Sequence, residues 1–204
     1  VPYIVNEGAE KYASFGTEKS KGTKLVSVSG HVKKPGNYEI EMGTPTSELI
    51  YNLAGGIRND NKLKAFIPGG SSVPMLPADK VDTPYDYESL AAAGTMLGSG
   101  ALIVIDDSVN IVETTLRLIS FYMHESCGKC TPCREGTRWL YQIVERIMQN
   151  KGQLEYIEKL EDICGNMSFK AFCPLADACV APVVSSIKHF RSDYEEYFKN
   201  VGVS

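Results

Sequence analysis

The chain has 204 residues, of which 43% are apolar and 23% are charged, and its formal net charge is −4. This is the composition of an ordinary globular protein with one or two domains. So mild a charge gives no reason to expect nucleic acid or an anionic membrane surface as a partner. No apolar run is long enough for a transmembrane helix, and no leader resembles a signal peptide, so we expect no direct insertion into a membrane.

The first 21 residues predict a short helix followed by a loop from Gly16 to Gly22. They carry too little apolar surface to fold alone. We therefore predict that residues 1–21 are a linker or the tail of a preceding domain. The chain begins with Val1 rather than methionine, and we expect it to be a fragment or a processed product.

Residues 22–107 predict a small α+β domain. Apolar and polar residues alternate over 26–29 and again over 38–41, as in a hairpin. Thr44 and Pro45 predict a helix start, and Gly55 with Gly56 its end. Further strands are predicted at 64–67 and 102–105, and a short helix at 87–93. The order of strand, strand, helix, strand, short helix and strand suits a β-grasp-like domain.

Two glycine-rich stretches, residues 69–70 and 98–100, invite comparison with phosphate-binding loops. Neither matches the P-loop pattern, and neither stands between a strand and a helix in the required way. We therefore predict that both are turns rather than parts of a nucleotide site.

Residues 108–204 predict four helices with short links, and hence a four-helix bundle. The clearest apolar stripe runs over residues 139–148, and we expect all of it, Trp139 included, to lie in the core. A third helix is predicted before a loop at residues 165–172.

The last helix is predicted to run from Pro174 to about Lys199. We expect Pro182 to kink it or to lie close to its first turns. The acidic residues near its end are expected to form a solvated face; they are Asp193, Glu195 and Glu196.

Three cysteines, Cys127, Cys130 and Cys133, lie within seven residues of a polar loop. Mutual disulfides are awkward at this spacing, which favours a reducing compartment. Three converging thiolates leave one position open on a four-iron cluster or a tetrahedral metal. We predict Cys173 as the fourth ligand, because ferredoxins also place a proline, here Pro174, directly after an isolated cluster cysteine.

Four cysteines arranged as three plus one favour a 4Fe–4S cluster over zinc, which usually pairs C-x2-C with a second pair of ligands. A redox dithiol and inert thiols remain as alternatives. The two cysteine segments precede the second and fourth helices, so an up-down-up-down bundle places them at the same end. Helix N-termini there would stabilise an anionic cluster and raise its potential. Cys164 and Cys179 are expected to be buried apolar residues.

Three charged or titratable residues flank the cysteine loop. His124 could be a ligand or a proton carrier, but a residue in this position is more often a hydrogen-bond donor or a surface residue. Lys129 and Arg134 either tune the potential by their charge or are solvated loop residues.

The cysteine segments, residues 125–136 (ESCGKCTPCREG) and 172–177 (FCPLAD), closely resemble the NADH-binding flavoprotein subunit of respiratory complex I. Residues 28–38 (VSGHVKKPGNY), 67–72 and 96–101 resemble the SLBB domain of the same subunit, a ubiquitin-like β-grasp module. The resemblance covers nearly the whole chain, in the order of the family.

This resemblance implies that the four cysteines bind a 4Fe–4S cluster, which takes single electrons from FMN reduced by NADH and passes them along an iron–sulfur chain toward quinone. It also implies a flavin-facing loop after the fourth ligand. The residues concerned are Cys127, Cys130, Cys133 and Cys173 for the cluster, and Pro174, Leu175 and Ala176 for the flavin.

In that family FMN and NADH are bound mainly by an N-terminal domain. Residues 1–21 of this chain resemble the end of that domain. The chain therefore resembles the C-terminal half of the subunit, and we do not expect it to oxidise NADH alone. The resemblance implies partners in the peripheral arm of complex I, including a 2Fe–2S thioredoxin-like subunit and a multi-cluster iron–sulfur subunit. It implies a peripheral location on the cytoplasmic side of the bacterial inner membrane, or on the matrix side in mitochondria.

Two alternatives remain open. Soluble NAD-linked hydrogenases and formate dehydrogenases contain flavoprotein subunits with the same core. A zinc-stabilised interaction module without redox activity would use the same four cysteines.

Overall fold

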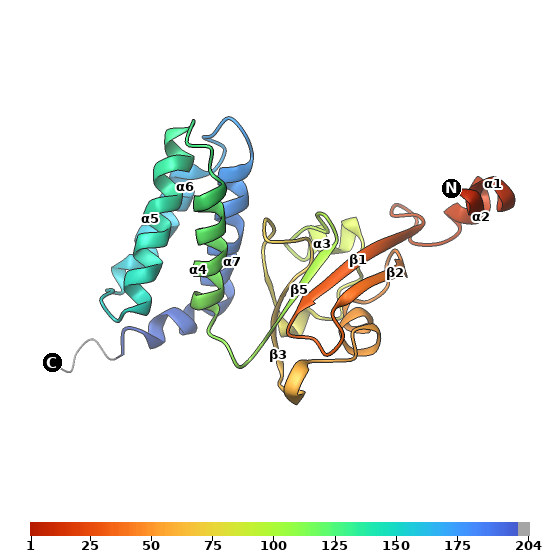
Figure 1. The fold of residues 1–204 in the computed structure, drawn as a ribbon, viewed down its shortest axis with the longest axis horizontal. Helices are drawn as coiled ribbons and strands as arrows, with labels where there is room; N and C mark the ends of the chain where they lie inside the picture. Colours follow the sequence, from red (N-terminus) through yellow and green to blue (C-terminus); the bar gives the residue numbers. More distant parts are fainter. Residues whose placement is uncertain (200–204) are drawn as a thin grey trace. The chain divides into compact units, whose positions relative to one another are not determined.

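The fold was analysed in a computed structural model that describes residues 1–199 (Figure 1). The chain divides into two compact units, Val1–Ser108 and Val109–Ser204. The first unit mixes a sheet with short helices, the second is helical, and each contains its own apolar core. Among the described residues, no helix has the length and apolar character needed to cross a membrane.

The first unit is built on a five-stranded sheet with the order β2-β1-β5-β3-β4. Strand β1 pairs antiparallel with β2 and parallel with β5, while β3 pairs antiparallel with both β5 and β4. The predicted hairpin and the two further predicted strands are confirmed, whereas the short β4 was not predicted. The strands are β1 (Thr23–Gly30), β2 (Gly36–Glu41), β3 (Leu63–Ile67), β4 (Leu76–Pro77) and β5 (Ala101–Asp106).

Short helical segments precede and connect these strands. The helix predicted from Thr44 begins at residue 46, slightly later than predicted, and is π-helical over η1, from Glu48 to Leu53. The Thr44 hydroxyl donates to the Glu41 carbonyl instead of capping a helix, and Pro45 forms a β-bridge with Pro84. The helical segments are α1 (Pro2–Glu7), α2 (Ala9–Ala13), η1 (Glu48–Leu53), η2 (Arg58–Asp60), η3 (Ala78–Lys80) and α3 (Tyr87–Ala92).

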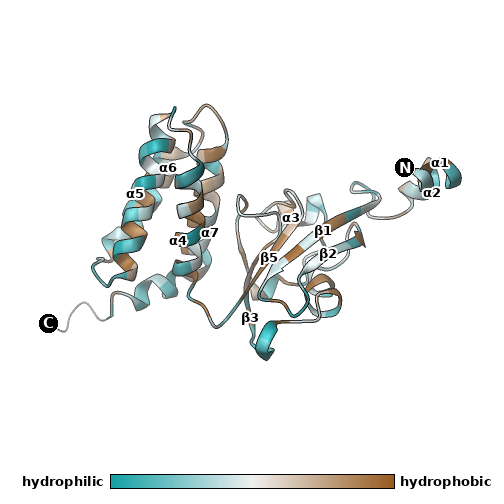
Figure 2. Cartoon of the chain, in the orientation of Figure 1, coloured by the Kyte–Doolittle hydropathy of each residue, from teal (hydrophilic) through white to brown (hydrophobic). Residues whose placement is uncertain are grey.

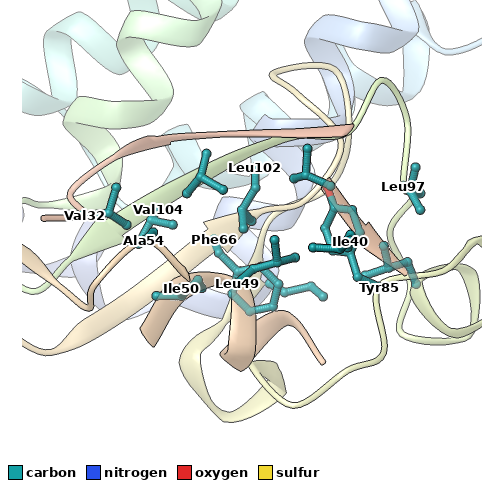
Figure 3. Close-up of a cluster of buried hydrophobic side chains, with 14 of the residues drawn as sticks. Val32, Ile40, Leu49, Ile50, Ala54, Phe66, Tyr85, Leu97, Leu102 and Val104 are labelled. Carbon is teal, nitrogen blue, oxygen red and sulfur yellow. The ribbon is translucent and has the colours of Figure 1, made fainter. Parts of the chain in front are cut away.

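The core of the first unit lies between the sheet and the segments η1 and α3 (Figure 3). Phe66 from β3 meets Leu49 and Ile50 from η1 in this cluster, and all three are fully buried. The hydroxyl of buried Tyr85 donates to the Pro68 carbonyl, and burial raises the pKa of this phenol. The apolar residues of the predicted helix therefore lie in or against the core, although the helix begins slightly later than predicted.

The two glycine stretches are turns that lie directly against each other. The Ser99 N–H donates to the Gly69 carbonyl at 3.2 Å. A Cβ at Gly69 would lie 2.5 Å from the Met96 carbonyl oxygen, and one at Gly98 would lie 2.3 Å from the Gly69 oxygen. Close backbone contact therefore requires both glycines, and the turns need no phosphate ligand to explain them.

The end of β5 holds a buried carboxylate, Asp106. Its Oδ1 accepts the Ser108 N–H at 3.1 Å and lies 2.8 Å from His31 Nδ1. Its Oδ2 accepts the Asn61 amide at 3.0 Å and lies 3.6 Å from Arg58 Nε. Burial raises the pKa of this carboxyl, but the hydrogen bonds outweigh it and hold the pKa well below its usual range.

The second unit contains the four predicted helices. Helix α4 packs against α5 and α7, and α6 also packs against both α5 and α7. Each helix carries an apolar face and a polar face (Figure 2), as their spacing predicts. Their bounds are α4 (Ile111–Glu125), α5 (Thr131–Met148), α6 (Glu155–Met167) and α7 (Leu175–Glu196).

Three details of these helices differ from the prediction. Gly165 lies inside α6 rather than in a loop, because Cys164 and Met167 are buried in the core on either side of it. Helix α7 begins after Pro174 and ends at Glu196. Its non-helical residue is Phe190, at φ −135° and ψ 37°, so Pro182 does not mark a kink; it lies close to the first turns of α7, which is the second alternative that the sequence left open.

Trp139 does not lie in the core as predicted, since it is 52% exposed. The rest of the stripe is confirmed in part, with Leu140, Val144 and Ile147 fully buried. Trp139 lines a groove of about 280 Å³ between α5 and α6, together with Pro132, Ile163 and Met167. The helical period places Trp139 at the edge of the apolar face. At such a position, periodicity alone does not tell whether a side chain is buried in the core or lines a surface groove.

Asp193 is also not the solvated residue that its acidic neighbourhood predicts. It is 8% exposed, and its Oδ2 accepts the N–H of Ile111 at 2.8 Å. Its carbonyl accepts the Asn110 side-chain amide at 3.3 Å. The first N–H groups of a helix have no partner within the helix, so the carboxylate satisfies one of them and complements the dipole of α4.

We predict that Asp193→Ala lowers the free energy of unfolding of the second unit by about 1.5–3 kcal/mol, because a buried charged hydrogen bond is lost. Urea unfolding followed by the fluorescence of Trp139, the single tryptophan, measures this. Glu196→Ala, which removes an exposed carboxylate from the same helix, is the control and should change stability by less than about 0.5 kcal/mol. Equal effects of the two substitutions would contradict the capping role.

We also predict a pH-dependent contribution from Asp106. Because its folded-state pKa is depressed, its stabilisation is present above the unfolded pKa of about 3.9 and is lost as the pH falls through the folded value. The stability difference between the wild type and Asp106→Asn should therefore be largest near pH 6 and shrink below about pH 4. Hydrogen exchange of the β5 amides measures it, with Asp79→Asn as an exposed control. A difference that stays constant with pH would refute this.

Candidate metal centre

The three clustered cysteines lie where α4 ends and α5 begins. Ser126 follows the last residue of α4 in an extended conformation, and Cys130 is the N-cap residue of α5. Exposure decreases along the motif, since Cys127 is exposed, Cys130 is half-buried and Cys133 is buried in the first turn of α5. Pro132 suits this first turn because its nitrogen needs no hydrogen-bond partner there.

Hydrogen bonds fix the backbone of this connection. Gly128 has φ +77°, in the left-handed region. Its carbonyl accepts Arg134 Nη1 at 2.7 Å, and its N–H donates to Ser126 Oγ at 3.4 Å. Arg134 Nε also donates to Glu135 at 2.8 Å. Arg134 is therefore tied to the loop and is not a freely solvated charge.

Cys173 lies in the connection between α6 and α7 and is exposed. Phe169 in the same connection has φ +55°, a strained conformation for a bulky side chain. Its N–H donates to Asp177 Oδ1 at 2.8 Å. Asp177 is in the first turn of α7, where the helix dipole favours a negative charge. The carboxylate therefore anchors the strained part of the Cys173 connection.

The two cysteine-bearing connections contact each other. The Phe172 N–H donates to Cys130 Sγ at 3.2 Å, across 42 residues of sequence. Lys129 Nζ lies 4.9 Å from the centre of the Phe172 ring, within the range of a cation–π interaction. Cys173 is the next residue, so this contact brings its segment of the chain to the triplet. The contact agrees with the prediction, made from helix topology, that both segments lie at one end of the helices.

The donor set fits an iron–sulfur cluster. All four cysteines are free thiols. Two of their sulfurs have hydrogen-bond partners, since Cys130 Sγ accepts the Phe172 N–H and Cys133 Sγ lies 3.2 Å from the Ser126 hydroxyl oxygen, as is usual around such clusters. Within residues 1–199, no group of three or more His, Cys, Asp or Glu side chains already stands in a metal-binding arrangement. The assignment of Cys127, Cys130, Cys133 and Cys173 as ligands stays a prediction.

The two other cysteines are buried, as predicted. Cys164 is 1% exposed and Cys179 is fully buried. Burial, with a smaller contribution from Glu161, raises the pKa of Cys164 to about 12. Burial also raises the pKa of Cys179, helped by the neighbouring sulfurs of Cys164 and Cys133. Both therefore remain protonated and unreactive at neutral pH.

The expected flavin-facing loop offers less surface than its three residues suggest. Pro174 is exposed and Leu175 is half-buried, whereas Ala176 has no exposed surface. Only Pro174 and Leu175 can therefore contact another molecule without rearrangement, and a flavin-facing role of this loop stays a prediction. His124 is exposed in the last turn of α4.

Sequence reasoning missed Ser126, Asp177 and the backbone N–H of Phe172. The sequence positions of the two side chains could have indicated a role in the site, since Ser126 directly precedes the first cysteine and Asp177 lies in a helical first turn. Their partners could not be predicted, because they depend on loop conformations such as the left-handed Phe169.

Comparisons with known proteins match both units. Residues 113–197 match the family model of the NADH-ubiquinone oxidoreductase-F iron-sulfur binding region, and residues 24–104 match that of the SLBB domain. The first match contains all four predicted ligands. The second contains the hairpin and the two glycine turns.

Among curated relatives, the F subunit of the NADH-quinone oxidoreductase of Streptomyces coelicolor is 46% identical over 202 residues, which are 99% of this chain and 45% of that protein. Its counterpart in Mycobacterium tuberculosis is 48% identical over the same length and with the same coverage. That of Rickettsia typhi is 43% identical over 205 residues, covering 100% of this chain and 49% of that protein. The chain spans about half the length of these relatives.

Among solved structures, an NAD+-reducing [NiFe]-hydrogenase in the air-oxidised state superimposes with a TM-score of 0.84 at 30% identity, covering 95% of this chain and 33% of that chain. The relatives named above agree with the resemblance found in the sequence motifs. The chain therefore belongs to the family of the NADH-quinone oxidoreductase F subunit and corresponds to the part of that protein with an SLBB domain and the iron–sulfur binding region.

Proposed function

We propose that this chain is the electron-transfer part of an NADH dehydrogenase, with a 4Fe–4S cluster held by Cys127, Cys130, Cys133 and Cys173. The contact of the Phe172 N–H with Cys130 Sγ at 3.2 Å carries this proposal, because it joins the segment of the fourth cysteine to the other three. When bound, such a cluster takes up and releases single electrons. The similarity to NADH-quinone oxidoreductase relatives supports the same function.

The chain's own residues hold, shield and orient the centre. Cys133, in the first turn of α5, supplies a ligand from the side of the core. Cys127 and Cys173 supply ligands from the exposed side, where a redox partner has access. Arg134 holds the loop through the Gly128 carbonyl. We propose that α4–α7 form a four-helix bundle with this centre at one end, and that the sheet unit is a β-grasp domain.

We further propose that the electrons come from FMN reduced by NADH, both bound mainly by a part of the subunit outside the matched region. A flavin can accept a hydride and release single electrons, so it suits this position. The electrons would continue toward quinone through a 2Fe–2S thioredoxin-like subunit and a multi-cluster iron–sulfur subunit. Such a complex would place this chain peripherally on the cytoplasmic side of a bacterial inner membrane, or on the matrix side in mitochondria.

A second candidate is the flavoprotein subunit of an NAD-linked hydrogenase, which the superposition on an NAD+-reducing hydrogenase favours. A formate dehydrogenase subunit is a related alternative of the same kind. All three would use the cluster in the same way, and the partner subunits that copurify with the chain distinguish them.

We predict about four irons and four acid-labile sulfides per chain after anaerobic purification. Cys173→Ala should lose the cluster because the fourth ligand is removed. Cys164→Ala should retain it, since that thiol is buried in the core. Iron, sulfide and zinc analysis measures each variant. Zinc without sulfide would contradict the electron-transfer function and favour a zinc-stabilised interaction module. Full iron and sulfide in Cys173→Ala would refute the ligand assignment.

We predict that Asp177→Ala loses iron to a chelator about tenfold faster than the wild type, because the lost hydrogen bond to Phe169 is worth roughly 1.4 kcal/mol. Asp177→Asn keeps an oxygen acceptor and should recover most of this loss. Asp162→Ala is the control, since that carboxylate is exposed and bonds only locally to Asn166 among the contacts seen for it. Equal chelation rates in all variants would contradict the anchoring role.

A further inference from the structure

Ser126 places a side-chain hydroxyl directly on one of the proposed ligands. Its Oγ lies 3.2 Å from Cys133 Sγ. The same oxygen accepts the N–H of Gly128 at 3.4 Å, so the hydroxyl proton is free to point elsewhere. A cysteine that binds a metal is a thiolate without a proton. The hydroxyl must therefore be the donor and Cys133 Sγ the acceptor.

The surroundings of Cys133 make this hydrogen bond strong. Cys133 is 6% exposed and belongs to the core cluster of the second unit. Little water competes for its sulfur, and a hydrogen bond is electrostatically stronger in such a low-dielectric site. A donor to a charged acceptor adds further strength. Burial and the charge of the acceptor therefore both strengthen the hydrogen bond between Ser126 and Cys133.

We propose that Ser126 is a positioning residue that raises the reduction potential of the centre through its hydrogen bond to Cys133 Sγ. The inference rests on the proposed 4Fe–4S function and deepens it. Reduction adds one electron and no proton, so the reduced state carries one more negative charge on iron and sulfur. The hydroxyl proton stabilises that charge more than the charge of the oxidised state. Removing the donor therefore favours the oxidised state and lowers the potential.

Ser168 provides a matched control within the same unit. Both serines directly follow a helix, Ser126 with φ −63° and ψ 121°, and Ser168 with φ −60° and ψ 124°. Both are half-buried. The Ser168 hydroxyl, however, donates to the Cys164 carbonyl at 2.8 Å and not to a proposed ligand. Ser126→Ala and Ser168→Ala therefore remove a hydroxyl from similar backbone positions and differ chiefly in the group that the hydroxyl contacts.

The test is a redox titration of the full chain with dithionite and mediators, followed by electron paramagnetic resonance. Ser126→Ala should lower the equilibrium constant for reduction about tenfold, which is about 59 mV for one electron. Ser126→Thr keeps the hydroxyl and suits the extended backbone, so it should restore the potential. Ser168→Ala should leave the potential unchanged. All variants should contain the iron and sulfide of the wild type.

Three results would overturn the inference. An unchanged potential in Ser126→Ala would show that the hydroxyl does not act on the centre. Equal shifts in Ser126→Ala and Ser168→Ala would show a general effect of serine removal. Loss of iron in Ser126→Ala but not in Ser168→Ala would mean that the hydroxyl builds the loop rather than setting the potential. Absence of iron and sulfide from the wild type would instead refute the proposed function itself, and the two failures are thus distinguishable.

Discussion

The hydrogen bond from the Phe172 N–H to Cys130 Sγ is the contact on which the proposed centre depends. The triplet belongs to the connection between α4 and α5, whereas Cys173 belongs to the connection between α6 and α7. Only the packing of the helices against one another brings these connections together. The apolar core of the second unit therefore determines the position of polar loops that contribute little to that core themselves.

Two charged side chains fix the backbone conformation of the two cysteine-bearing loops. Arg134 holds the first loop through the Gly128 carbonyl, and Asp177 holds the second through the Phe169 N–H. Each belongs to the first turn of the helix that follows its loop. The helix thus fixes the loop that precedes it, and the same rigid elements that form the core also orient the sulfurs and their hydrogen-bond donors.

Much of this architecture could be predicted from the sequence, because helix period and strand alternation reflect which side of an element is buried. The four helices, the hairpin and the meeting of the cysteine segments follow from such patterns. The failures occur where a tertiary contact decides. Gly165 is helical because its neighbours are buried, and Asp193 is buried because the start of α4 needs an acceptor. Ser126 was overlooked because its partner is set by the loop conformation.

The gradient of exposure from Cys133 to Cys127 and Cys173 determines which sulfurs the solvent can reach. Cys133 belongs to the apolar core cluster of the second unit, to which all four helices contribute residues. Packed side chains therefore shield its thiol, whereas Cys127 and Cys173 are exposed. A thiol reagent in water should reach the two exposed cysteines before Cys133, so burial and not the order of the cysteines in the sequence sets their accessibility.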